Sequence, residues 1–432
     1  MQKDLFSEEF PHKLHYNDKN LLGINEYSND IILDFFDMVS YICYTDFYTP
    51  RDEDVNNLRK LTVTIPVNNY KTFNSIKNDM EKLLTYMTNG EKWNITFVEN
   101  KSIKFLSREQ RVIRDNTKYN SIALLSGGLD SMAGSVLEKD NNTIFVTYET
   151  NSIEVNNSNE IYENLIKNEK NNHVIIGKIK HEEDEHYTER TRSLMFIATS
   201  LIYADYYKIE NVKIYENGIM SLNPKFNFSR RVTKTTNQKT LYLINNILDK
   251  LDIKIKVTNP FKYKTKGEII KIIPNANVEY IRKQTRTCAK HSGVVHFRNK
   301  NKGNFHCGIC TACVLRQIGE TNSNMNGTDY LVPINLYNLK DILEYENKIS
   351  KNNDKIKDEK AAVYKYNEKR SLLEYYRLYY DKIQNSEIYN YLDLKKEYYE
   401  DENWIKNIEN MLKQFCGEVD IYFKSIKGWE NK

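Results

Sequence analysis

The sequence SGGLDS at residues 126–131 is the stretch from which the fold of this chain can be inferred. It follows the apolar run IALL at residues 122–125, which is typical of a buried parallel strand. It precedes residues 132–137, whose apolar positions have helical spacing. The two glycines therefore occupy a strand-to-helix turn at the carboxyl end of a strand. Open α/β sheets bind their ligands at this edge, so we expect a binding site there.

The residue types in this turn favour a phosphate ligand. Gly127 and Gly128 let backbone N–H groups approach an anion without an intervening Cβ, and the following helix adds partial positive charge at its N-terminus. Asp130 would repel a phosphate unless a metal ion bridged the two, so we expect Mg²⁺ between Asp130 and the phosphates. The predicted nucleotide-binding residues of the turn are Ser126, Gly127, Gly128, Leu129, Asp130 and Ser131.

The turn lacks the Gly-Lys-Ser/Thr of a Walker loop. It resembles instead the PP-loop of the ATP pyrophosphatase superfamily, whose motif is Ser-Gly-Gly-x-Asp-Ser. The resemblance implies an enzyme that adenylates a substrate oxygen with ATP and releases pyrophosphate. The alternative is a Gly-Gly turn that carries flanking serines by chance.

Length, composition and charge set the broad class. The 432 residues suffice for two or three domains, and 40% hydrophobic with 12% aromatic residues favour a globular protein. The net charge of +4 is too small to indicate nucleic acid as a direct ligand. No apolar run predicts a membrane span, and the start MQKDL lacks a signal core. We therefore expect a cytoplasmic protein whose six cysteines are thiols or metal ligands rather than disulfides.

The chain divides into three predicted regions. Residues 1–115 form an N-terminal α+β module, residues 116–330 alternate strand and helix, and residues 331–432 are charge-dense with helical periodicity. We predict an α/β fold of the PP-loop, HUP-like kind: a doubly wound, mostly parallel five-stranded sheet with the N-terminal module and a C-terminal helical appendage. The appendage would pack on the core or on a partner. The strand candidates are residues 122–125, 144–148, 174–179, 212–215 and 253–257.

A cysteine cluster is the second strong signal. Cys288, Cys307, Cys310 and Cys313 have the spacing C-x18-C-x2-C-x2-C. Gaps of two residues let thiolates converge on one ion, and four thiolates suit a structural, tetrahedral Zn²⁺ site. An iron–sulfur cluster is the chemical alternative. If Cys288 is not the fourth ligand, the nearby stand-ins are His291, His296 and His306.

The motifs together resemble the QueC family, the 7-cyano-7-deazaguanine synthases. The resemblance covers roughly residues 118–320 and rests on the PP-loop, the sequence TKGEII at residues 265–270, and CGIC at residues 307–310 followed by Cys313 and Arg316. It implies zinc on the cysteines and ATP-dependent conversion of 7-carboxy-7-deazaguanine to a nitrile through an acyl adenylate.

The chain also departs from that family. QueC proteins are about half as long and have a shorter gap after the first cysteine. The sequence RTRS at residues 190–193, ENG at residues 216–218 and the terminal regions look more like the QatC-type proteins of bacterial anti-phage operons. That resemblance implies a 7-deazaguanine-type small molecule as substrate and an amine acceptor, which would be ammonia or a partner protein from the same operon.

Further residues support a nucleotide site. Thr265 and Glu268 fit a capping box, which would aim Lys266 at the ligand edge, where it could neutralise departing pyrophosphate; the alternative is a solvent lysine. Of Arg190 and Arg192, one guanidinium is expected to bind a carboxylate or phosphate and the other to lie at the surface. We assign catalysis to Asp130, Lys266 and Arg192.

Residues at other strand ends complete the predicted site. Tyr148 and Glu149 end the second strand, where adenine would lie in this fold, and we add Tyr148 and Gly218 to the nucleotide-binding residues. Glu216 could pair with the N–H edge of a guanine-like ring; the alternative is an Asn-Gly turn. Arg230 and Arg231 could hold the substrate carboxylate or face water.

Two other functions share these motifs. A tRNA-thiolating PP-loop enzyme would need an iron–sulfur cluster or a redox-active cysteine pair and a basic RNA-binding face. A non-catalytic ATP-binding scaffold would tolerate loss of Asp130.

Overall fold

A computed structural model gives the structure of this chain in segments. The residues it describes are 29–50, 58–99, 118–149, 152–176, 190–224, 226, 234–273, 279–281, 285–288, 306–323, 325, 328–332, 338–349 and 355–426. Arg230, Arg231, His291 and His296 lie outside the described residues, so the expectations for them are not tested.

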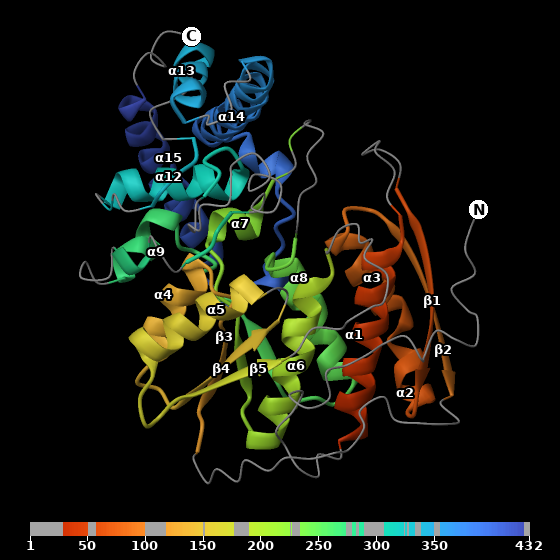
Figure 1. Cartoon of the computed structure of the whole chain (residues 1–432). Helices are drawn as coiled ribbons and strands as arrows, with labels where there is room; N and C mark the ends of the chain where they lie inside the picture. Colours follow the sequence, from red (N-terminus) through yellow and green to blue (C-terminus); the bar gives the residue numbers. More distant parts are fainter. Residues whose placement is uncertain are drawn as a thin grey trace.

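A parallel sheet of five strands forms the centre of the molecule (Figure 1). The spatial order is β5-β4-β3-β6-β7, so the chain moves outward from β3 in one direction and then returns to continue on its other side. This confirms the doubly wound sheet, whose switch point lies between β3 and β6. The strands are β3 (Ser121–Leu124), β4 (Thr143–Tyr148), β5 (Asn172–Ile176), β6 (Asn211–Lys213) and β7 (Lys256–Thr258).

Alternate residues of the central strands enter two different cores. Ile122 and Leu124 pack into one hydrophobic cluster, whereas Ala123 and Phe145 pack into another on the opposite face. Helices α6 (Arg192–Tyr207) and α8 (Gln238–Lys250) belong to the first face. The second face carries α4 (Leu129–Glu138), α9 (Lys266–Ile272), and α5 (Ser152–Ile161) with the π-helical turn η3 (Tyr162–Ile166).

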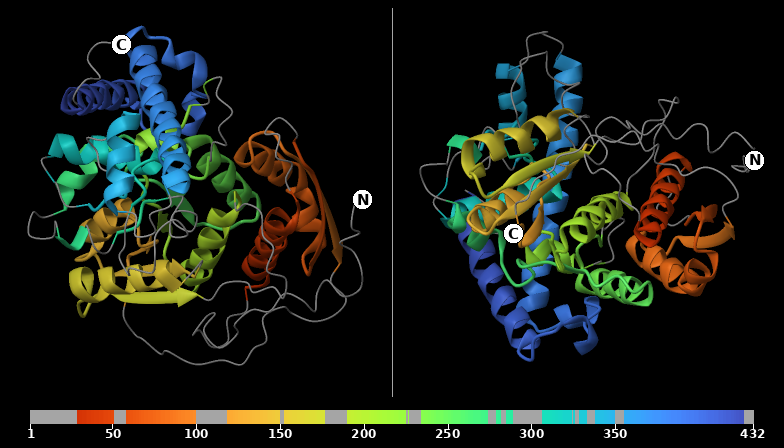
Figure 2. Two further views of the ribbon diagram at one scale, coloured as in Figure 1. Left: turned by 45° about the horizontal axis from the view of Figure 1, so that its top comes forward. Right: turned by 90° about the horizontal axis from the view of Figure 1, so that it is seen from below.

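The N-terminal unit packs against α6 (Figure 2, right). Its α1 (Asp30–Tyr48) lies on α6, and β1 (Lys60–Val67) pairs in parallel with β2 (Lys92–Glu99). The crossover between these strands contains α2 (Tyr70–Ser75) and α3 (Lys77–Met87). The unit contains helices and strands, but the parallel pairing through a helical crossover makes it a β-α-β unit rather than the predicted α+β module. Its apolar side chains share one hydrophobic cluster with the first face of the sheet.

The C-terminal region is helical, as expected, and packs on the core. Its elements are α13 (Leu339–Ile349), α14 (Lys355–Gln384), the 3₁₀ turns η5 (Ile388–Tyr391) and η6 (Lys396–Tyr398), and α15 (Trp404–Ser425). Helix α15 contacts α12 (Thr311–Ser323), which follows the cysteines, and α7 (Gly218–Leu222), which follows β6. Tyr375, Tyr376 and Tyr379 of α14 are buried in a hydrophobic cluster that also contains side chains of α7, α12 and α15. Among the described helices, none is both long and apolar enough to cross a membrane.

Candidate active site

The glycine turn has the conformation that an anion site requires. Gly127 has φ +74°, which favours glycine, and Gly128 directly precedes α4. The Ser131 hydroxyl donates to the Gly128 carbonyl at 3.0 Å and accepts from the Ser126 N–H at 3.3 Å, which closes the turn. No side chain of the described residues caps α4, so the N–H groups of its first turn are available to a ligand.

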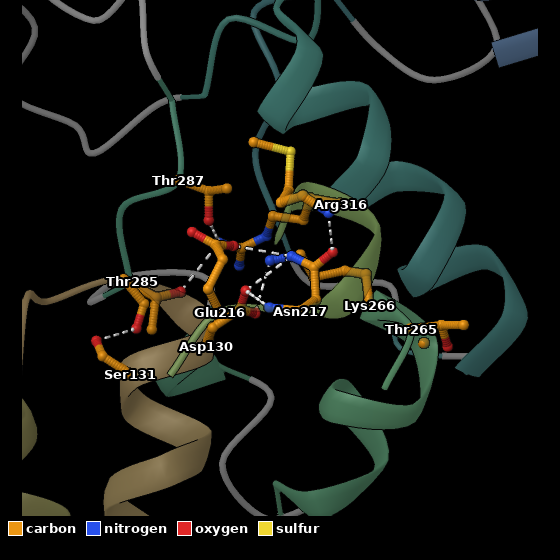
Figure 3. Close-up of polar contacts among 12 residues, drawn as sticks. Asp130, Ser131, Glu216, Asn217, Thr265, Lys266, Thr285, Thr287 and Arg316 are labelled. Atoms are coloured by element: carbon orange, nitrogen blue, oxygen red, sulfur yellow. Dashed lines mark hydrogen bonds and ion pairs between the residues drawn. The ribbon is translucent and has the colours of Figure 1, made fainter. Parts of the chain in front are cut away.

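Asp130 lies beside Glu216, Asn217 and Lys266 (Figure 3), next to the switch point between β3 and β6. Its Oδ1 accepts from Lys266 Nζ at 2.6 Å, and its Oδ2 accepts from the Asn217 N–H at 3.1 Å and Nδ2 at 2.9 Å. Lys266 and Asp130 are both buried. A Mg²⁺ ion at Asp130 would have to share the carboxylate with Lys266, and the Mg²⁺ expectation stays a prediction.

Glu216 and Asp130 form a carboxyl pair with opposite pKa shifts. Burial by itself would raise the pKa of Asp130, but Lys266 and hydrogen bonds from Glu216 and Asn217 outweigh burial and lower it. Burial, and then the charge of Asp130, raise the pKa of Glu216 well above its ordinary value. Of the two carboxyl groups, Glu216 is therefore the one that favours the protonated form, and Asp130 is the one that favours the ionised form.

The capping box places Lys266 as predicted. The Thr265 hydroxyl accepts from the Glu268 N–H at 3.2 Å, and Glu268 accepts from the Thr265 N–H at 2.8 Å. Lys266 is the first residue of α9, and its side chain points into the site rather than to solvent. The solvent-lysine alternative is therefore wrong.

Glu418 on α15 reaches the same helix start. It accepts hydrogen bonds from the Thr265 hydroxyl and from the Gly267 N–H, the latter at 3.3 Å. Gly267 leaves the space for it, because a Cβ there would lie 2.4 Å from Glu418 Oε1. The C-terminal region thus contributes a buried carboxylate beside Lys266.

The segment 285–288 links the glycine turn to the cysteines. The Arg286 N–H donates to the Gly127 carbonyl at 2.9 Å, and Cys288 follows two residues later. The buried Arg316 holds this segment from α12: its Nη1 donates to the hydroxyls of Thr285 at 3.0 Å and Thr287 at 3.1 Å (Figure 3). Its Nε pairs with Glu320 at 2.8 Å.

The four cysteines converge. Their sulfur atoms lie within 4.8 Å of one another, and Cys307 Sγ is 3.8 Å from Cys313 Sγ. A tetrahedral Zn²⁺ with Zn–S bonds of about 2.3 Å spaces its ligands by about 3.8 Å, so the set fits one such ion. Backbone N–H groups of Cys307, Ile309 and Cys313 donate to cluster sulfurs at 3.4 Å, which favours thiolates.

The geometry also bears on the alternative ligands. An iron–sulfur cluster binds its cysteines through separate iron atoms and spreads the sulfurs farther apart than one ion does, so the compact set favours a single metal ion. His306 is buried, but its Nε2 accepts from Arg316 Nη1 and from the Thr287 N–H, each at 3.2 Å. It supports the segment before Cys288, and the four cysteines form the set without it.

Arg190 and Arg192 have different surroundings. Arg190 is buried, with its N–H bonded to Asp46 at 2.8 Å and its Nη1 to the Thr88 carbonyl at 2.6 Å. It therefore joins α6 to the N-terminal unit. We expect one of the two arginines at the surface, and Arg190 is not at the surface. Arg192 starts α6 and is half-buried, and its assignment to catalysis stays a prediction.

Tyr148 and Gly218, which we also predict to bind the nucleotide, both make packing contacts within the protein. Tyr148 ends β4 in a buried position and packs edge-to-face on Phe196, with ring centroids 5.5 Å apart. Gly218 donates its N–H to the Lys264 carbonyl at 2.8 Å, and a Cβ there would lie 2.1 Å from Met411 Sδ on α15. Packing thus explains this glycine, and the nucleotide-binding role of both residues stays a prediction.

Sequence reasoning did not assign Glu418, Asn217, Thr285 or Thr287 to the site. Asn217 begins α7 as its N-cap, whereas its sequence context predicts only a turn residue. Glu418 lies in a helix with no motif, so only the tertiary structure could reveal it. For Thr285 and Thr287, proximity to Cys288 was the single available signal.

The doubly wound sheet, with the glycine turn at its switch point and the cysteine set nearby, is an α/β fold consistent with the PP-loop kind. Residues 145–323 match the family model of the queuosine biosynthesis protein QueC, which supports a QueC-like PP-loop family for this chain. The match contains Glu216, Lys266 and all four cysteines, and the glycine turn lies just before it. Neither the curated proteins nor the solved structures contain a significant match.

Proposed function

We propose that this chain uses ATP to adenylate the carboxylate of a 7-deazaguanine and passes the acyl group to an amine acceptor. The observation that carries this is the meeting of Asp130, Asn217 and Lys266 at the switch point, beside the glycine turn. The QueC family match supports ATP use and this substrate class.

The residues of the chain would bind and orient rather than react. A substrate carboxylate oxygen attacks the α-phosphorus of ATP, the bond from that phosphorus to the β-phosphate oxygen breaks, and pyrophosphate leaves. N–H groups of the turn and of the first turn of α4 would hold the phosphates, and Lys266 would offset their charge. When bound, Mg²⁺ would neutralise charge on the phosphates. A side-chain nucleophile is not required.

Glu216 is our candidate for recognising the purine-like ring. Its side chain is half-buried three residues after β6, and its carboxyl oxygens would accept hydrogen bonds from the N–H edge of the ring. Tyr148 would lie beside adenine, Arg192 would contact a carboxylate or phosphate, and the cysteines would hold Zn²⁺.

The acceptor amine attacks the acyl carbon of the adenylate, AMP leaves, and an amide forms with loss of a proton. We propose a protein amine from a partner of the same operon, in anti-phage defence of the QatC type. The support is the resemblance of the sequence motifs together with extensive N-terminal and C-terminal regions that surround the sheet.

The test is to incubate the protein with ATP, Mg²⁺ and 7-carboxy-7-deazaguanine, with and without candidate partner proteins, and to measure pyrophosphate and AMP. We expect both products in equal amounts, and Asp130→Ala is expected to abolish them. Absence of AMP in every mixture contradicts the proposal, and normal cellular function with Asp130→Ala would indicate a scaffold.

A second candidate is 7-cyano-7-deazaguanine synthase in queuosine-type biosynthesis, which the family match favours. Here ammonia forms the amide, a second ATP adenylates the amide oxygen, and loss of AMP and a proton leaves the nitrile. Mass spectrometry separates the two: a nitrile with two AMP per substrate indicates the synthase, and a mass increase on a protein indicates conjugation.

A further inference from the structure

Two buried donors near the glycine turn lack partners within the described part of the chain. Asn157 on α5 is 3% exposed, and its Nδ2 is buried without a hydrogen bond. Arg286 is half-buried, and its Nη1 is likewise buried without one. Buried polar groups are nearly always hydrogen-bonded, and an unpaired charged donor is costly. Two such donors beside one turn indicate an acceptor that the described part of the chain does not supply.

Both residues adjoin the same turn. A Cβ at Gly127 would lie 3.1 Å from Asn157 Cβ and 3.0 Å from the Glu154 carbonyl, so the start of α5 closely approaches the turn. Arg286 is bonded through its N–H to the Gly127 carbonyl, and its own carbonyl oxygen would lie 3.5 Å from a Cβ at Gly128. One backbone hydrogen bond thus ties Arg286 to Gly127, and its carbonyl oxygen lies beside Gly128.

The missing acceptor is expected to be an anion. Arg286 always carries a positive charge, and the uncapped start of α4 favours negative charge at the same turn. Glu154 and Cys288 lie close enough to interact electrostatically with Arg286, but neither accepts a hydrogen bond from its Nη1. Asp130 is already paired with Lys266.

The geometry points to Arg286 and Asn157 as further phosphate-binding residues, which donate to the triphosphate of a nucleotide on the glycine turn. This inference rests on the proposed function, because that function puts the triphosphate there. Arg286 supplies the charged contact, and Asn157 supplies a neutral one. Because Arg286 is two residues from Cys288, the metal-binding cysteines would help to preorganise this contact.

The test is equilibrium binding of α,β-methylene-ATP with Mg²⁺, which requires neither turnover nor an acceptor. We expect Arg286→Gln to weaken binding by about 10- to 100-fold, and Asn157→Ala by about 5- to 10-fold. Arg286→Lys should retain part of the affinity, because it keeps the charge and loses the planar fork. The matched control is Arg377→Gln on the exposed side of α14, which should bind as the parent does.

Metal content and melting temperature without nucleotide are measured for each variant. Parent-like affinity in both Arg286→Gln and Asn157→Ala overturns the inference. Loss of metal with parent-like affinity in Arg286→Gln assigns Arg286 to the cysteine cluster and also overturns its phosphate role. If Arg286→Gln does not fold, Arg286→Lys and Asn157→Ala decide in the same assay. If the parent protein itself binds no α,β-methylene-ATP, that result contradicts the proposed function and not the roles of the two residues. If the parent binds it, the affinities of the variants for pyrophosphate and for AMP show which phosphates Arg286 and Asn157 contact.

Discussion

Lys266 and Asp130 form a buried ion pair, with 2.6 Å between Nζ and Oδ1, although 136 positions separate them in the sequence. The pair joins the start of α4 to the start of α9 and brings the two most informative motifs into contact. Both charged groups are buried away from water, so each needs the other to compensate for its lost hydration.

We predict that breaking this pair from either side destabilises the protein. Asp130→Asn or Lys266→Met should each cost about 3–5 kcal/mol of unfolding free energy, because each leaves a buried charge or polar group without its partner. The double variant should cost less than the sum of the two. Urea unfolding of the four proteins measures the coupling. The control is Lys167→Met, whose exposed pair with Glu163 should contribute at most about 0.5 kcal/mol. Additive single effects would contradict the prediction.

Glu418 should make stability depend on pH. Burial raises the pKa of Glu418 from 4.5 to about 7, partly offset by hydrogen bonds from Thr265, Gly267 and Gln414, while Glu268 raises it further. The folded state therefore holds this proton more tightly than the unfolded state does. The resulting stabilisation is complete below about pH 4.5 and is lost as the pH rises through about 7, with a span of at most about 3 kcal/mol.

The variant Glu418→Gln cannot ionise, so its melting temperature should fall less between pH 5 and pH 8 than that of the parent, on the order of a few degrees. Glu374→Gln, at an exposed position of α14, should keep the pH profile of the parent. Parallel profiles for the parent and Glu418→Gln would show that Glu418 ionises as an ordinary surface carboxyl.

The cysteine set should bind one metal ion per chain. Metal analysis of the purified protein is expected to give about one Zn²⁺, and Cys310→Ser should lower both the metal content and the melting temperature, because binding energy of a structural site is folding energy. Cys43→Ala is the control, since Cys43 lies outside the set. Visible absorbance with bound iron after anaerobic purification would instead indicate an iron–sulfur cluster.

Arg316 should couple the cysteine set to the nucleotide site. Arg316→Met removes the donors to Thr285, Thr287 and His306 and leaves the buried Glu320 without its cationic partner, so we expect a loss of about 3–5 kcal/mol in stability. The segment 285–288 would lose its support, and the affinity for α,β-methylene-ATP should fall as well. Arg370→Met, an exposed arginine of α14, should change neither quantity. Weakened nucleotide binding is the decisive readout, because loss of stability alone would fit a purely structural arginine.

The sequence by itself determined the parts that depend on local physics. Residue periodicity predicted five parallel strands and the helical C-terminal region, the glycine turn predicted a site at the carboxyl edge of the sheet, and the capping box predicted the start of α9. The spacing of Cys307, Cys310 and Cys313 predicted their convergence. These features need only neighbouring residues, so a short stretch of sequence is enough to specify them.

Only the tertiary structure decided which charges meet. Four relationships join segments far apart in the chain: the pairing of Lys266 with Asp130, the effect of Asp130 on the pKa of Glu216, the insertion of Glu418 beside α9, and the burial of Arg190 against Asp46. Such contacts depend on how helices pack across the sheet, and no local pattern encodes that packing. Burial then sets the charge state, because removal from water changes the free energy of an ionised group far more than its sequence neighbours do.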